Sequence, residues 1–431
     1  MVETFEIPEG TLPGSVTPSP DASRAAYIVR ERQGMHLEVS GQAHPRHDAV
    51  SGLTFGADSR VVAYAAARGG RWYAVFGDRE LGPYADIGKT SPVISPDSSR
   101  VAFTASMGRD GWVAVLDGGV VGGPYEGFAP GGLLFSPDSR RLAYVVKTGK
   151  TWTVMDGGRE VASHAGVLER SLVFSPDSKK LAYLACEEEK RFLRQPRTVA
   201  MLIVDRERGP AWSHDEASGR NGLLDEIVFS HDSSRLAYAV ARNGRWAWVV
   251  GGEVQAGCDG FVSGWGANPT WASFPDYGKT CCRKQTLVFS PDSRHFAYAG
   301  TDGGRHAAFL YGEPQGWHQG ILNWPLVFSP DSATLAYGAE EGGRQFMIVN
   351  GKAGVRHYGI CGDRAFSPDS TQLGYISMED RDSFSLVVGR RTWQMPGGPL
   401  AGCRLVWDGP GHVHTLVAKG RRITIVEWRT C

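Results

Sequence analysis

Nine aspartates recur at nearly regular intervals, and a repeated carboxylate of this kind could bind a cation or stabilise a turn. The nine are Asp21, Asp58, Asp97, Asp138, Asp177, Asp232, Asp292, Asp331 and Asp369. Most stand in the sequence Ser-Pro-Asp-Ser, where Pro presets φ while Asp and Ser bond nearby backbone amides. Because one carboxylate occurs in each copy, we expect turn stabilisation, with no bound metal and no cofactor.

Other residues with metal-binding or nucleophilic chemistry are sparse. His412 and His414 lie two apart and would share a strand face, as a metal pair requires. No third ligand is suitably spaced, so ordinary polar roles are favoured. Cys281 and Cys282 are adjacent, unlike a Cys-x-x-Cys clamp, and we expect reduced thiols. Nucleophile-elbow, phosphate-loop and His-Glu-x-x-His motifs are all missing from the sequence, which predicts no catalytic residues and a protein that is not an enzyme.

The aspartates mark an internal repeat. Successive spacings are 37, 39, 41, 39, 55, 60, 39 and 38 residues, so the period is near 39 and two copies carry insertions. In the copy around Asp138, β-rich runs at 141–146, 151–155 and 159–162 are separated by Gly-containing turns. Such short links predict hairpins. Each copy is therefore expected to be a four-stranded antiparallel meander, with strands a to d.

The second strand of each copy predicts how neighbouring copies pack. Its centre pairs a small residue with an aromatic one, as in Ala143-Tyr144 and Ala182-Tyr183. In Ala102-Phe103 the aromatic residue is phenylalanine. Adjacent strand residues point to opposite faces of a sheet. The aromatic ring of one sheet can then fill the space beside the alanine of the next, which buries both faces. A radial stack of such sheets is a β-propeller.

A degenerate tenth copy follows near Pro410 and supplies only three strands before the chain ends. We expect the segment Thr4 to Ile7 to provide its missing outer strand, because this pairs an otherwise open edge and joins the two termini. The predicted fold is all-β: a single β-propeller of about ten four-stranded blades spanning residues 1–431, closed by the N-terminal strand. An open solenoid, or two rings of six and four blades, are the alternatives.

The Ser-Pro-Asp-Ser turns followed by Leu-Ala-Tyr strands resemble the WD-repeat-like propellers of the TolB type. The resemblance covers about 19–428, and it implies a propeller fold and, in many members, protein binding. The chain has Ser where that family usually has Gly after the Asp, and it lacks the extra α/β domain of a periplasmic TolB. The resemblance is therefore specific for fold and not for function.

Bulk composition excludes some classes of partner. Lys plus Arg number 46 and Asp plus Glu number 46, so no global field favours nucleic acid. The N-terminus lacks a signal-peptide pattern, and no apolar run is long enough to span a membrane. The seven scattered cysteines are odd in number. We therefore expect a cytoplasmic, bacterial-type protein with reduced thiols. The oligomeric state is not predicted.

Two insertions interrupt the repeat and contain the candidate partner-binding residues. The first spans residues 187–198 between strands b and c of blade 5, and the second spans residues 255–286 after blade 6. In a four-stranded meander the b–c and d–a connections emerge at the same end, so both insertions should share one face. The candidate residues combine aromatic and arginine side chains, which is typical of interface hot spots. They are Arg191, Phe192, Arg194, Arg197, Phe261, Trp265, Trp271, Phe274 and Tyr277.

Two uses of these residues, and three functions, remain open. The aromatic insertion either binds a partner or folds back as a plug that buries its own rings. A basic residue recurs before strand c, at Arg71, Lys150, Arg245, Arg305 and Arg344, and it either adds positive charge to this face or is simply solvated. The leading function is a scaffold that binds a protein or peptide. The alternatives are a small-ligand or carbohydrate binder, and an enzyme with its site at the channel mouth.

Overall fold

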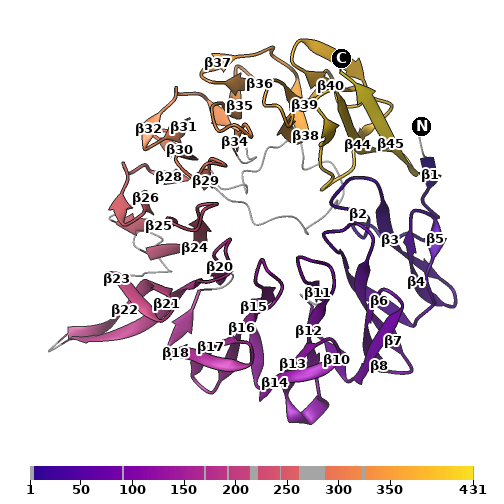
Figure 1. Ribbon diagram of the computed structural model, residues 1–431, viewed down its shortest axis with the longest axis vertical. Helices are drawn as coiled ribbons and strands as arrows, with labels where there is room; N and C mark the ends of the chain where they lie inside the picture. Colours follow the sequence, from indigo (N-terminus) through magenta and orange to yellow (C-terminus); the bar gives the residue numbers. More distant parts are fainter. Residues whose placement is uncertain are drawn as a thin grey trace. The chain divides into compact units, whose positions relative to one another are not determined.

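The computed structural model describes residues 4–89, 92–168, 171–191, 194–213, 222–242, 244–261, 287–322 and 326–430. Within these ranges the strands form ten antiparallel sheets; nine follow the chain order a, b, c, d, and in the tenth the outer strand is β1 from the other end of the chain. The predicted fold class is confirmed: the chain is an all-β propeller with ten four-stranded blades, numbered 1 to 10 along the sequence (Figure 1). In five blades, strand a is divided into two short pieces that both pair with strand b.

The chain divides into two compact units, and the first to be described comprises His47–Gly257. It contains blades 2 to 6 and one short 3-10 helix, η1 (Gly108–Asp110). Its strands are β6 (Ala49–Phe55), β7 (Val62–Arg68), β8 (Arg71–Phe76) and β9 (Arg79–Tyr84) in blade 2; β10 (Asp86–Ile87), β11 (Val93–Ile94), β12 (Val101–Ser106), β13 (Trp112–Leu116) and β14 (Gly119–Tyr125) in blade 3; β15 (Gly127–Phe135), β16 (Leu142–Thr148), β17 (Thr151–Asp156) and β18 (Arg159–His164) in blade 4; β19 (Gly166–Val167), β20 (Val173–Phe174), β21 (Leu181–Arg191), β22 (Arg194–Val204) and β23 (Glu207–Ser213) in blade 5; and β24 (Gly222–Phe229), β25 (Leu236–Arg242), β26 (Arg245–Val250) and β27 (Glu253–Val254) in blade 6.

The other unit joins the two ends of the chain, Met1–Arg46 and Cys258–Cys431, and contains blades 7 to 10 and blade 1. Its strands are β2 (Thr17–Pro18), β3 (Ala25–Glu31), β4 (Gly34–Val39) and β5 (Gln42–Ala43) in blade 1; β28 (Gly260–Phe261), β29 (Leu287–Phe289), β30 (Phe296–Asp302), β31 (Arg305–Leu310) and β32 (Glu313–Pro314) in blade 7; β33 (Gly320–Ile321), β34 (Val327–Phe328), β35 (Leu335–Glu341), β36 (Arg344–Val349) and β37 (Lys352–Ala353) in blade 8; β38 (Gly359–Phe366), β39 (Leu373–Met378), β40 (Phe384–Val388) and β41 (Arg391–Gln394) in blade 9; and β42 (Gly398–Pro399), β43 (Val406–Gly409), β44 (His412–Lys419), β45 (Arg422–Arg429) and β1 (Thr4–Glu6) in blade 10.

The N-terminal strand completes blade 10, as predicted. β1 pairs antiparallel with β45, with Thr4 opposite Thr424 and Glu6 opposite Arg422. The side chain of Phe5 packs against the hydrophobic cluster formed by blade 10 and the start of blade 1. The last sheet therefore gains its outer strand from the opposite end of the chain, which covers an edge that would otherwise be open.

The hydrophobic core lies between consecutive blades, where a small residue faces an aromatic one. Ala143 of blade 4 shares a buried cluster with Tyr183 of blade 5, and both side chains are fully buried. In the other unit, Ala297 of blade 7 and Tyr337 of blade 8 form the same kind of pair. The predicted packing of alanine against ring is therefore confirmed within each unit.

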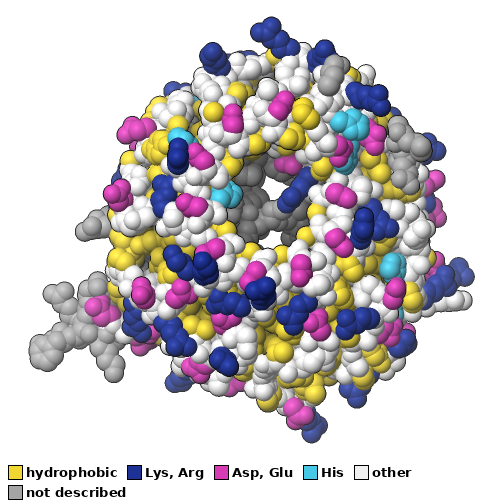
Figure 2. Space-filling model, viewed as in Figure 1, with side chains coloured by type: hydrophobic (Ala, Val, Ile, Leu, Met, Phe, Trp, Pro, Cys, Tyr) yellow, Lys and Arg dark blue, Asp and Glu magenta, His cyan; other side chains and the backbone are white. Residues whose placement is uncertain are grey.

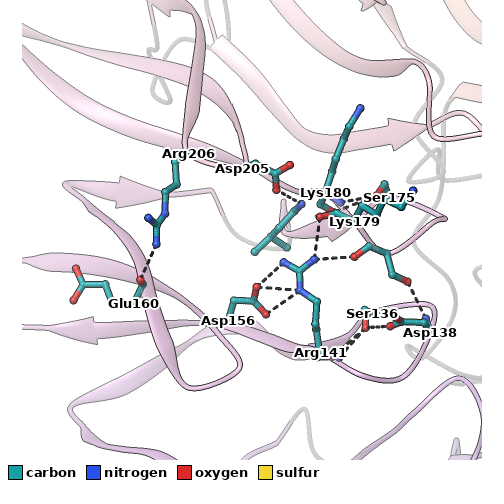
Figure 3. Close-up of polar contacts among 12 residues, drawn as sticks. Ser136, Asp138, Arg141, Asp156, Glu160, Ser175, Lys179, Lys180, Asp205 and Arg206 are labelled. Atoms are coloured by element: carbon teal, nitrogen blue, oxygen red, sulfur yellow. Dashed lines mark hydrogen bonds and ion pairs between the residues drawn. The ribbon is translucent and has the colours of Figure 1, made fainter.

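The repeated aspartate holds the a–b turn together in the way the sequence predicts. In blade 4, the hydroxyl of Ser136 donates to Asp138 Oδ1 (2.5 Å) and accepts a bond from the N–H of Arg141 (2.9 Å), as Figure 3 shows. The same carboxylate oxygen also accepts the N–H of Arg140 (3.1 Å). One buried serine and one aspartate thus pair the polar groups of a tight turn that opens toward solvent.

The serine that follows most of these aspartates connects one blade to the previous one. Ser178 has a φ of +63°, a left-handed conformation that normally favours Gly. Its Oγ accepts the backbone N–H of Asp138 from blade 4 at 2.9 Å. The contact recurs at Asp58–Ser98, Asp97–Ser139, Asp177–Ser233, Asp292–Ser332 and Asp331–Ser370. A glycine at this position would adopt the left-handed conformation more easily, but it has no side-chain oxygen to make this bond.

An arginine strengthens the contact between blades 4 and 5. Arg141 binds Asp156 of its own blade (Nη2–Oδ2, 2.5 Å) and donates from Nη1 to the carbonyl of Ser178 in blade 5 (2.7 Å) (Figure 3). Its guanidinium also lies 4.7 Å from the ring centroid of Phe174 in blade 5. A planar guanidinium can make all three contacts at once, which the ammonium of a lysine could not do.

Replacing Ser178 with alanine tests the connection between blades. Ser178→Ala keeps the left-handed conformation but leaves the N–H of Asp138 without its acceptor. We expect the free energy of unfolding to fall by about 0.5–1.5 kcal/mol, the net contribution of a typical hydrogen bond. Chemical denaturation followed by circular dichroism measures this change. Lys179→Ala, at the exposed neighbouring position, is the control, and an equal effect of both changes would contradict the role of the serine oxygen.

Candidate partner-binding face

The b–c turns and the d–a linkers meet at the same end of each blade, which we call the connection end. In blade 2, Oδ2 of Asp48 in the linker accepts the N–H of Gly69 in the b–c turn (2.7 Å). In blade 4, Glu126 and Gly149 make the same contact (3.0 Å). Asp259–Gly303 and Gln319–Gly342 repeat it in the other unit. The two kinds of connection that carry the insertions therefore lie together within single blades.

The basic residues before strand c are at this end, but they do not behave alike. Arg71, Lys150 and Arg344 are exposed. Arg245 and Arg305 each donate to a linker carbonyl of their own blade, that of Gly257 (2.6 Å) and that of Trp317 (2.7 Å). Two of the five side chains thus support the outer linker, and the other three leave positive charge in solvent.

The 187–198 insertion lengthens a hairpin. β21 and β22 have 11 residues each, whereas strands b and c of blade 4 have 7 and 6. The hairpin projects past the blades that flank it in this unit (Figure 1). Arg191 lies opposite Arg194, and Glu189 lies opposite Arg197. Three of the predicted site residues, Arg191, Arg194 and Arg197, therefore belong to one two-stranded arm.

The root of this arm is fixed by a buried histidine that the sequence analysis did not single out. His164, at the end of β18 in blade 4, lies 3.0 Å through Nε2 from the hydroxyl of Tyr183. Its Nδ1 lies 2.8 Å from Oε1 of Glu187, the first residue of the arm. Burial raises the pKa of Tyr183 to about 12, so the phenol stays protonated and can donate. Arg208 lies 3.7 Å from the same carboxylate oxygen of Glu187.

A linker motif could have identified this histidine. Several d–a linkers contain a polar or aromatic residue, any residue, Gly and then an apolar residue, as in His164 to Val167 and His357 to Ile360. His357 repeats the arrangement with Tyr375 (3.2 Å) and Glu379 (3.0 Å). The carboxylate stands four residues after the tyrosine in both blades. This linker motif recurs with the same period as the aspartate turns, and its recurrence was the signal in the sequence that could have identified His164.

Of the residues predicted in the aromatic insertion, only Phe261 lies in the described part of the chain. It ends β28, is partly buried, and its ring lies edge-on to that of Tyr298 at 5.7 Å. Trp265, Trp271, Phe274 and Tyr277 lie outside the described residues, as does Phe192 of the first insertion. Phe261, within the second insertion, therefore contributes to the packing of blade 7.

The histidine pair of blade 10 makes hydrogen bonds within the protein. Nδ1 of His414 lies 2.7 Å from Oδ2 of Asp408, and its Nε2 lies 2.7 Å from the carbonyl oxygen of Asp21 in blade 1. Both ring nitrogens are therefore engaged, which favours the polar role expected from the sequence. In the described residues, no three His, Cys, Asp or Glu side chains come together as a metal site.

Charge is mixed on the face drawn in Figure 2. Lys and Arg side chains are interspersed with Asp and Glu, in keeping with the 46 basic and 46 acidic residues of the chain. No helix in the described ranges has the length and apolar character needed to cross a membrane. Any recognition of a charged partner must therefore rely on local groups rather than on a field of the whole molecule.

Comparison with known proteins finds similar structures but no matching protein family. No family model matches the chain, and no curated protein matches its sequence. A crystal structure of a eukaryotic initiation factor is similar over 87% of this chain and 96% of that one, with 12% identity and a TM-score of 0.46. The Dos1 propeller is similar over 98% and 93%, with 9% identity and a TM-score of 0.37. A putative TolB from Agrobacterium tumefaciens covers 54% of this chain, and 87% of its own is covered, with 11% identity and a TM-score of 0.27.

These sequence identities and TM-scores are too low to indicate a function. The fold is assigned from the arrangement of the ten sheets. The structural likeness to a TolB protein does not establish a family. The resemblance of the Ser-Pro-Asp-Ser turns to TolB-type repeats therefore stays an interpretation of the sequence.

Proposed function

We propose that this chain is a non-catalytic propeller scaffold that binds a protein or peptide through the face carrying the 187–198 and 255–286 insertions. The observation that carries the proposal is the arm of blade 5. Its strands have 11 residues each and extend past the strands beside them, so the arm offers surface that the blade itself does not use. Its root is held by a hydrogen-bonded chain in which His164 and Tyr183 are buried and Glu187 is half-buried. A fixed root lowers the entropy lost when the arm binds a partner.

The second insertion supplies the aromatic part of the proposed surface. Cys258, near the start of this insertion, is fully buried in blade 7. Its aromatic residues, among them Trp265 and Trp271, are the types that dominate binding energy when buried at an interface. Arg191, Arg194 and Arg197 of the arm add the cations that such interfaces contain.

The proposal predicts that a double change of Trp265→Ala and Trp271→Ala weakens binding of the partner by about 30-fold or more, because each ring would be a hot spot. The partner is first isolated by pull-down from native lysate, and its affinity is then measured by isothermal titration calorimetry. The melting temperature should change by no more than about 2 °C, since surface changes rarely alter stability much.

Tyr358→Ala is the matched control for this experiment, because Tyr358 is an exposed aromatic residue outside both insertions. It should leave the affinity unchanged. A large fall in melting temperature of the tryptophan variant with no loss of binding would instead support the plug, in which the insertion buries its own rings.

A cytoplasmic location and reduced thiols complete the proposal. The four cysteines among the described residues, Cys186, Cys258, Cys361 and Cys403, are all free. A gain in thermal stability with sugars or nucleotides, together with no protein partner, would favour the small-ligand alternative.

A further inference from the structure

The seam between blade 10 and blade 1 joins parts of the chain that are far apart in sequence. On one side are strands β42 to β45, and on the other are β1 and the sheet of blade 1 (Figure 1). β1 pairs with β45 over three residues, and a hydrophobic cluster that includes Ala22, Ala25, Leu400 and Leu416 spans the two blades. Noncovalent contacts must therefore hold this seam closed.

The seam lacks the serine contact that connects other blades. Ser178, for example, accepts the N–H of Asp138 from the preceding blade. Blade 1 has Ala22 at the serine position, with a similar left-handed φ of +55°, and a methyl group accepts no hydrogen bond. Blade 10 differs as well, because Trp407-Asp408-Gly409-Pro410 stands in place of Ser-Pro-Asp-Ser. A different group must connect these two turns.

His414 of β44 makes this connection. Its Nε2 lies 2.7 Å from the carbonyl oxygen of Asp21 in blade 1, a residue 393 positions away in the sequence. Its Nδ1 lies 2.7 Å from Oδ2 of Asp408 in its own blade. The residue is 9% exposed, so little water can reach the ring to replace either partner.

Both partners of the ring need a proton from it. A carbonyl oxygen can only accept, so Nε2 donates to Asp21, and an ionised carboxylate also only accepts, so Nδ1 must donate to Asp408. A neutral imidazole has one N–H, and the two bonds together therefore need the doubly protonated ring. His164 differs, because its Nε2 faces the hydroxyl of Tyr183, which can itself donate to a neutral ring.

The charged groups around the ring come from four elements. His412 shares the carboxylate of Asp408, with its Nδ1 3.5 Å from Oδ2. Glu427 lies directly opposite His414 in the sheet, and Arg429 lies directly opposite His412. The full set is Asp408 of β43, His412 of β44, Glu427 and Arg429 of β45, and Asp21 and Arg24 of the blade 1 turn. Carboxylates outnumber guanidinium groups in this set, so the surroundings do not oppose a cationic ring.

We propose that the seam is a proton-controlled clasp, which closes fully when His414 carries two ring protons and loosens when the ring loses one. A neutral ring can donate to Asp21 or to Asp408 but not to both, and its other nitrogen then presents a lone pair to an oxygen. The stability that the clasp contributes is therefore present on the acid side of the histidine titration and lost as the pH rises through it. The inference is independent of the partner proposed above, because the seam lies outside both insertions.

The test is hydrogen exchange of the full chain, measured by mass spectrometry at about pH 6 and about pH 8.5 and corrected for the intrinsic exchange rate. The N–H groups of Ala22 and Arg24 are both bonded to Ser19 within the blade 1 turn. Their opening equilibrium should rise by about 10-fold or more at the higher pH, the change expected when one charge-assisted hydrogen bond is lost. The blade 4 turn, Ser136 to Arg141, is the internal control, because serine connects it to blade 5; it should show no such rise.

Two variants separate the proton from the contact. In Asp408→Asn the amide can donate to Nδ1 while Nε2 donates to Asp21, so a neutral ring keeps both bonds. The seam should then stay closed at both pH values. His414→Gln has no ring proton to lose, and its seam should open equally at both pH values. His412→Gln is the matched control, since it removes the neighbouring imidazole and should leave the pH dependence of the unmodified chain unchanged.

Circular dichroism confirms that each variant is folded. Equal opening of the unmodified seam at the two pH values would overturn the proposal. So would an unchanged pH dependence in Asp408→Asn, or its loss in His412→Gln. If His414→Gln does not fold, the unmodified chain and Asp408→Asn still decide the outcome.

Discussion

Replacing Phe103 with alanine is expected to lower the free energy of unfolding by about 3–5 kcal/mol. Phe103 of blade 3 is fully buried and packs in one cluster with Ala65 and Ala74 of blade 2. Its ring also packs edge-on against that of Tyr84 of blade 2, with the centroids 5.5 Å apart. Because side chains in a close-packed core relax only partly, these neighbours fill only part of the space left by the ring. The cost therefore includes both the lost transfer energy and a cavity.

The effect is measured as the shift of the denaturant midpoint, followed by circular dichroism at constant slope. Val120→Ala is the control within the same blade, since Val120 on the outer strand is 56% exposed. It should change stability by no more than about 0.5 kcal/mol. Equal shifts for the two variants would show that the space between blades is not the main hydrophobic core.

Acid is expected to unfold the protein through its repeated turns. The hydroxyl of Ser136, with the backbone N–H of Arg140 as the next largest cause, holds the pKa of Asp138 below its ordinary value of 3.8. The pKa values of Asp177, Asp292, Asp331 and Asp369 are lowered by the equivalent serine hydroxyls. Hydrogen bonds to the charged form favour that form.

The direction of the pH effect follows from these lowered values. A carboxylate whose folded pKa lies below its unfolded one contributes stability that is fully present above the unfolded pKa. That contribution is lost as the pH falls through the folded pKa. Since several turns share this property, the melting temperature should fall steeply as the pH drops below about 4.

Asp138→Asn isolates the contribution of a single turn. Asparagine keeps an acceptor oxygen but does not titrate, so the dependence of melting temperature on pH should become shallower below about pH 4. Asp58→Asn is the matched control, because the turn of blade 2 has Gly56 in place of the donor serine. A slope changed as much by Asp58→Asn as by Asp138→Asn would argue against the serine as the cause.

How far the sequence could predict the candidate site depends on the range over which each feature acts. The arm of blade 5 was visible as a break in the repeat between Glu187 and Thr198, because inserted residues change a spacing. Its root was not visible, because His164 and Tyr183 belong to different blades and their contact depends on how two sheets stack. The role of Phe261 was equally hidden, since its contact with Tyr298 forms only once blade 7 has folded.

The sequence by itself determined the meander, its number of copies and the exchange of the N-terminal strand. These follow from local turn chemistry, from a period of two along strands and from a tenth copy that lacks one strand. The tertiary structure decided why Ser178 is not a glycine and which groups hold the arm. Both depend on hydrogen bonds between blades, whose partners are set by the register of facing sheets rather than by neighbours along the chain.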